Sequence, residues 1–93
     1  MAVALVWYWR EDYPRVLEVM EDAGSLQTTW KAWLRDAERL ERKLMREGFG
    51  VVRVFLAPDE FIQWCKSENL APIGSSRSRW ASVKAKEVPA AEP

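Results

Sequence analysis

The chain has 93 residues, 48% of them hydrophobic, which is the size and composition of one small globular domain. Its 14 basic and 14 acidic side chains balance, so the net charge gives no argument for a nucleic-acid or membrane partner. With no histidine and a single cysteine, Cys65, the chain lacks the residues for a Ser-His-Asp triad, a Cys/His zinc site or an internal disulfide. We therefore expect no enzymatic activity, no metal and no cofactor.

Residues 2–9 form a short apolar run rich in aromatic and β-branched side chains, which predicts a buried strand. Leu5, Trp7 and Trp9 would point to one side of this strand, and the alternate residues, also apolar, to the other. The run is too short to span a bilayer, and no basic residues precede it as they would in a secretory signal. Together with the lone cysteine, this favours a cytoplasmic protein without a membrane segment.

The stretch 28–47 predicts a long amphipathic helix, with Thr28 or Thr29 as its N-cap and Gly48 as its stop. Its apolar residues, spaced three or four apart, share one side: Trp30, Trp33, Ala37, Leu40 and Leu44. The opposite side is basic. We expect the apolar stripe to pack on the sheet, with Trp33 and Leu40 near its centre.

The other elements are delimited mainly by proline, glycine, asparagine and acidic residues. They are a short helix capped by Asp12 and ended by Gly24, a strand over 51–56, a helix from Pro58 to Asn69 and a last helix from Ser75 or Ser76 to about Lys84. The Pro/Ala-rich residues 86–93 are expected to form a flexible tail. This leaves one domain over residues 1–85.

The predicted fold is a small α+β domain of two strands and three or four helices in the order β-α-α-β-α-α. Two helices between the strands return the chain in the opposite direction, so we expect an antiparallel pair; if the short first helix is only part of a loop, the pair is parallel. Either arrangement leaves both edges of a two-stranded sheet open.

Four arginines repeat at helical spacing on the basic side of the long helix and could contact phosphates: Arg35, Arg39, Arg42 and Arg46. Arg53 and the basic residues of 77–86 could extend that footprint. A solvated helix face, partly neutralised by neighbouring acids, explains the same pattern. Nucleic-acid binding is therefore the alternative function.

The leading function is an interaction or regulatory module that self-associates or binds a protein partner. Core positions explain most of the six tryptophans, but a chain of this size can leave Trp7 and Trp9 in need of cover. The candidate interface is therefore Leu5, Trp7 and Trp9, in a homodimer joined through the first strand. In the competing arrangement the C-terminal helix, through Trp80 and Val83, covers that face of a monomer.

Two segments carry a resemblance. One runs from Pro58-Asp59-Glu60-Phe61 through Trp64-Cys65 and Leu70-Ala71-Pro72 to an arginine at 77 or 79 and Ala81; the other is the Trp30/Trp33 helix that ends at Gly48. Through these two segments, residues 1–85 resemble short uncharacterised bacterial proteins of unknown function. The resemblance implies a bacterial cytoplasmic protein and assigns no activity.

Overall fold

The computed structural model describes residues 2–87. Two strands and four α-helices follow one another in this part of the chain: β1 (Ala2–Trp7), α1 (Tyr13–Val19), α2 (Trp30–Arg46), β2 (Gly50–Phe55), α3 (Pro58–Ser67) and α4 (Gly74–Glu87). Single 3₁₀ turns, Arg10–Asp12 and Ala23–Ser25, flank α1. The predicted α+β class, with a two-stranded sheet and one long helix, is confirmed.

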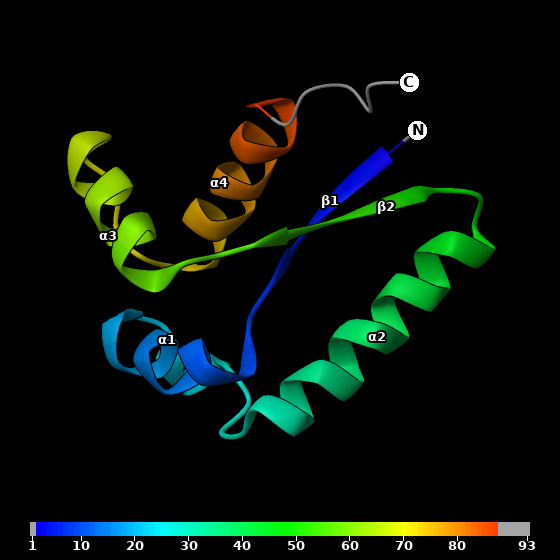
Figure 1. Ribbon diagram of the computed structural model, residues 1–93, viewed down its shortest axis with the longest axis horizontal. Helices are drawn as coiled ribbons and strands as arrows, with labels where there is room; N and C mark the ends of the chain where they lie inside the picture. The colour runs from blue at the N-terminus through cyan, green and yellow to red at the C-terminus, as the bar shows by residue number, and fades with distance from the viewer. Residues whose placement is uncertain (1, 88–93) are drawn as a thin grey trace.

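The two strands are parallel, in a register that runs from Ala2 opposite Gly50 to Trp7 opposite Phe55. The antiparallel expectation is therefore wrong. The seven-residue α1 and its flanking 3₁₀ turns act as part of the connection, while α2 alone carries the chain back beside the sheet (Figure 1). A single-helix crossover of this kind joins parallel neighbours.

Helices cover both faces of the sheet. α2 lies on one side of the strands and α4 on the other, while α3 lies beside α4 and α1 lies near the C-terminal ends of the strands (Figure 1). Trp7 meets Trp33 of α2 edge to face, with ring centroids 5.2 Å apart. The residues that alternate with Trp7 point to the face that α4 covers. The C-terminal helix α4 therefore covers a face of the sheet, but the face that carries Trp7 is covered by α2.

The core forms around these contacts and includes Trp7, Trp33, Phe61 and Trp80. Trp33 is buried as expected, but Leu40 keeps 44% of its surface exposed, so its predicted central position is wrong. Two strands about 4.8 Å apart make a narrow sheet that only the middle of a helical stripe can cover. Leu40 lies on the flank of α2 beside the outer edge of β1.

Local signals set most helix ends. The Thr29 side chain accepts a hydrogen bond from the Ala32 amide at 3.1 Å, and Gly48 adopts a φ of 93° after the last turn of α2. Asn69 has a φ of 55° and follows α3, as its position in the sequence predicts. Asp12, in contrast, makes no side-chain cap, because a 3₁₀ turn precedes α1.

The last helix differs from the expectation at both ends. α4 begins at Gly74 and continues to Glu87, so two residues of the predicted tail belong to the helix. Its first amide is bonded by Asp22 rather than by a serine of the helix itself. Residues 88–93 of the predicted tail lie outside the described residues.

Candidate interaction edges of the sheet

Within residues 2–87 the sheet contains only β1 and β2, so each strand has one outer edge without a neighbouring strand. The Leu56 amide donates to the Trp7 carbonyl at 2.9 Å, which turns the backbone of Trp7 toward β2. Because the ladder alternates, Ala4 and Val6 direct their N–H and C=O groups to the outer edge of β1. On β2 the outward residues are Val51, Arg53 and Phe55.

The outer edge of β1 is walled on both sides. It forms the floor of a groove of about 370 Å³ between α2, with Asp36 and Leu40, and the first turn of α4, with Gly74, Arg77 and Ser78. The indole N–H of Trp30 donates to the Tyr8 carbonyl at 3.0 Å just after the strand. After Ala2, every residue of β1 is half-buried or buried. This edge is therefore sheltered.

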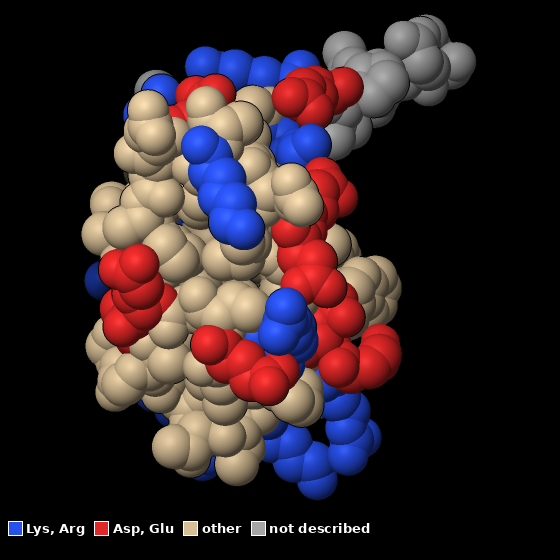
Figure 2. Space-filling model, turned by 90° about the vertical axis from the view of Figure 1, so that its left-hand side faces the viewer, with Lys and Arg blue, Asp and Glu red and all other residues tan. Residues whose placement is uncertain are grey.

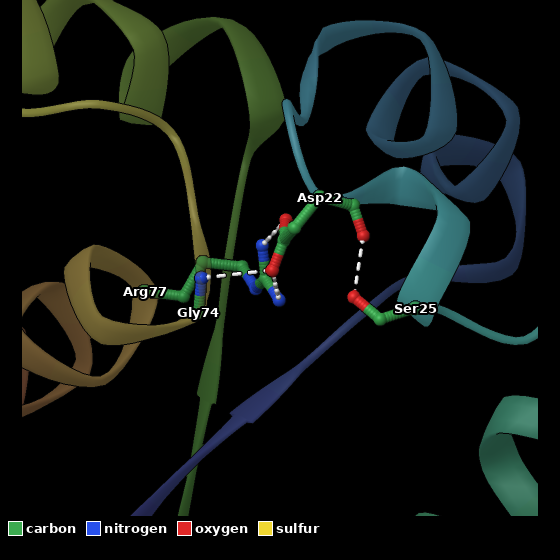
Figure 3. Close-up of polar contacts among 4 residues, drawn as sticks. All are labelled: Asp22, Ser25, Gly74 and Arg77. Atoms are coloured by element: carbon green, nitrogen blue, oxygen red, sulfur yellow. Dashed lines mark hydrogen bonds and ion pairs between the residues drawn. The ribbon is translucent and has the colours of Figure 1, made fainter.

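An ion pair holds α4 in this position (Figure 3). The two carboxylate oxygens of Asp22 accept hydrogen bonds from the Arg77 guanidinium at 2.7 and 3.0 Å, and one of them also accepts from the Gly74 amide at 3.0 Å. The guanidinium hydrogen bonds hold the pKa of Asp22 below its usual value. The side chain of Arg77 is only 10% exposed, so this Asp22–Arg77 pair is largely shielded from water.

The outer edge of β2 is open. Four of its six residues are exposed, including Val52, Arg53 and Phe55. The Trp9 ring, 52% exposed, stacks on Phe55 at 4.0 Å with an interplanar angle of 14°. On α2, Met45 lies one turn after Glu41, which binds Arg53, and keeps 60% of its surface exposed.

Of the five exposed large apolar side chains in residues 2–87, four therefore border this edge. We call these four side chains the β2 edge patch: Trp9, Met45, Val52 and Phe55. Apolar side chains that gather beside an unpaired strand mark a surface suited to a partner.

Arg53 is the only charged residue of β2, but its side chain does not project along the outer edge, where it would hinder pairing with another strand. Its guanidinium lies 4.0 Å from the centre of the Trp7 ring and donates two hydrogen bonds, of 2.7 and 2.8 Å, to the Glu41 carboxylate. Those hydrogen bonds lower the pKa of Glu41. The charge thus lies across the α2 face of the sheet, where it is neutralised, instead of projecting along the edge as protective charges do.

The predicted interface residues lie in three different environments. Leu5 is half-buried, Trp7 is 3% exposed beneath Trp33 and Arg53, and Trp9 is exposed. Of these three residues, only Trp9 exposes much of its side chain to a partner. An interface at the end of the first strand therefore stays a prediction, and it would depend on Trp9. The structure adds the outer edge of β2 as a candidate interface, which the sequence did not predict.

The four predicted phosphate contacts, Arg35, Arg39, Arg42 and Arg46, are exposed along α2. Within residues 2–87, only Arg39 among them has a carboxylate within 4 Å, that of Asp36 at 3.5 Å. Arg53 and Arg77, considered as extensions of the row, are already engaged by carboxylates. On the side that carries α3, Figure 2 shows side chains of both signs among uncharged ones, with most of the acidic ones gathered toward the right of the view.

Groups that could carry chemistry are few in the described part of the chain. Cys65 is 2% exposed, and burial raises the pKa of its thiol. Burial likewise raises the pKa of Tyr8 to about 12, although Arg77 opposes the shift. Across residues 2–87 no three His, Cys, Asp or Glu side chains group as metal ligands. None of the helices described there is long and apolar enough to cross a membrane.

Sequence reasoning missed the Asp22–Arg77 pair and the open edge of β2. The first joins residues 55 positions apart and has no local signal. The open edge of β2 had a weak sequence signal, since Arg53 is a lone charge in a strand that is otherwise apolar on both faces. Comparison with known proteins finds no matching family model, no matching curated protein and no matching solved structure.

Proposed function

We propose that the protein is an interaction module that docks a protein partner by adding a strand to the outer edge of β2. The observation that carries this proposal is the β2 edge patch beside a strand whose only charge is turned away. An added strand would bond to the outward N–H and C=O groups of Val51, Arg53 and Phe55. It would also remove the exposed rings of Trp9 and Phe55 from water.

The β1 edge fits this role less well. Its outward groups lie in a groove whose walls, α2 and the first turn of α4, leave room for one extended chain but obstruct a folded partner. A groove of about 340 Å³ also borders β2, with Glu60 of α3 and Trp80, Lys84 and Glu87 of α4 along it, but Val52 still keeps 40% of its surface exposed. Because no α2 residue lines this groove, helices wall it on one side only, whereas α2 and α4 wall the β1 groove on both sides.

Site-specific photo-crosslinking in the cells that produce the protein tests the proposal. A photoreactive analogue replaces Phe55 at the edge or, as the control, Gln63, which is exposed on α3. We expect adducts from position 55 and none from 63. Val51→Pro should abolish the adducts, because it removes an outward N–H while sparing the ladder to β1. The absence of adducts from position 55 would refute docking at this edge.

A second candidate function is nucleic-acid binding through α2. It is favoured by the exposed basic row Arg35, Arg39, Arg42 and Arg46, in which Arg39 alone has a carboxylate within 4 Å among the described residues. From Arg35 to Arg46 the row extends about 17 Å along the helix, enough to meet several phosphates. Replacing Arg35 and Arg42 together by alanine should weaken binding to any sequence and flatten its salt dependence. Failure to bind DNA or RNA at low salt would exclude this function.

A further inference from the structure

We infer that the partner at the β2 edge is a second copy of this chain, paired antiparallel through β2 about a two-fold axis that passes beside Val52. This inference rests on the proposed function and names its partner. The product is a four-stranded sheet in the order β1-β2-β2-β1. A symmetric arrangement buries the same surface on both copies and leaves no unsatisfied β2 edge to extend the assembly.

The position of the axis follows from the strand itself. In a continuous sheet, opposite residues must point to the same face, so the axis has to pass beside a residue and not between two residues. β2 runs from Gly50 to Phe55, so the two longest overlaps between the copies place the two-fold axis beside Val52 or beside Arg53. An axis beside Arg53 sets the two Arg53–Glu41 ion pairs directly opposite each other, which crowds four large side chains on one face of the sheet. An axis beside Val52 sets each Arg53 opposite Val51 of the other copy and pairs residues 50–54 of the two β2 strands.

Helix positions favour β2 over β1 for self-pairing. α2 reaches β1 through the Trp7–Trp33 contact and β2 through the Arg53–Glu41 pair, so its axis lies over the middle of the sheet. With strands about 4.8 Å apart, joining β2 to β2 sets the two α2 helices about 10 Å apart, an ordinary packing distance. α4 packs chiefly on β1. Joining β1 to β1 would drive the two α4 helices together.

The flank of α2 that faces the β2 edge also suits a second copy. Leu34, Glu38 and Met45 lie on the same flank as Glu41 at helical spacing. Because the two α2 helices run antiparallel, Glu38 of one copy lies toward the basic end of the other, which carries Arg42. This flank therefore offers the second copy an apolar side chain, Met45, and a carboxylate, Glu38.

The area that such a dimer buries is adequate. If large side chains have full areas of roughly 150–250 Å², then the exposed fractions of the β2 edge patch amount to on the order of 400 Å² per copy. That is about half of the ~800 Å² that each partner contributes to an interface of standard size. The edge backbone of residues 50–54 and the flank of α2 supply further area.

Disulfide trapping tests both the partner and the register. With the axis beside Val52, the two copies of this residue form a pair without backbone hydrogen bonds, with Cα atoms about 4.5 Å apart, which a disulfide can bridge. The two Arg53 residues would lie more than ~7 Å apart and could not be bridged. We expect Val52→Cys to give a disulfide-linked dimer on mild oxidation and Arg53→Cys to stay monomeric on a denaturing gel. Wild type is the control, because its Cys65 is buried.

Light scattering of the uncrosslinked wild type at tens of micromolar should give twice the 10.8 kDa mass of the chain. Phe55→Lys should return it to one chain, with circular dichroism confirming that the variant is folded. Crosslinking of Arg53→Cys in place of Val52→Cys would overturn the inferred axis. A single-chain mass with no crosslink at either position would overturn the second copy as partner, while the photo-crosslinking at position 55 would still decide independently whether the edge docks another protein.

Discussion

Replacing Asp22 by alanine should destabilise the fold, because it leaves Arg77 charged and enclosed. The variant loses two hydrogen bonds to the guanidinium and the bond that begins α4 at Gly74. Removing one partner of a fully buried ion pair costs about 3–5 kcal/mol. Since the Asp22 side chain is 26% exposed, water lowers this figure, and we expect a loss of about 2–4 kcal/mol with the cap included.

Urea denaturation of Asp22→Ala, Arg77→Ala and the double variant measures this loss and the coupling between the two side chains. The double variant should be no less stable than Asp22→Ala, because removing Arg77 as well relieves the cost of its enclosed, unpaired charge. The exposed pair of Asp36 and Arg39, 3.5 Å apart, is the matched control, and its removal should cost less than about 1 kcal/mol. If Asp22→Ala costs less than about 0.5 kcal/mol, the pair does not hold α4.

The same pair predicts a dependence on pH. The guanidinium lowers the pKa of Asp22 in the folded chain, so the ionised carboxylate contributes stability above its ordinary pKa, and this contribution is lost as the pH falls through the folded value. The difference in stability between wild type and Asp22→Asn should therefore be constant near pH 7 and shrink below about pH 4. A difference that stays unchanged down to pH 2 would contradict this assignment.

Three further outcomes can be checked by similar means. Trp33→Ala should cost about 3–5 kcal/mol, whereas Leu40→Ala, at a position 44% exposed, should cost less than about 1.5 kcal/mol; comparable losses in urea denaturation would show that both belong to the core. Thr29→Ala should cost about 1 kcal/mol through its lost cap and Thr28→Ala almost nothing, and equal effects would place the cap elsewhere. Cys65 should react with a thiol reagent only on unfolding, since it is buried and its pKa is raised; rapid reaction in buffer would contradict that burial.

The sequence by itself determined the elements and most of their ends. Thr29, Gly48 and Asn69 act through their own backbone or the next turn, so their effect can be read from neighbouring residues alone. The apolar period of α2 likewise predicts which side of the helix faces inward, and Trp33 lies there. These predictions succeed because the interactions involved span fewer than about five residues.

Tertiary structure decided how the elements combine. The strands are parallel because α1 and its turns serve as a connection, and Leu40 is exposed because the sheet is only two strands wide. Asp22 meets Arg77 across 55 residues, and Arg53 turns onto Trp7 and Glu41, which leaves the β2 edge without a projecting charge. Each of these results depends on the distance between elements remote in the chain. The pattern of side chains along one element sets its inward face but carries no information about that distance.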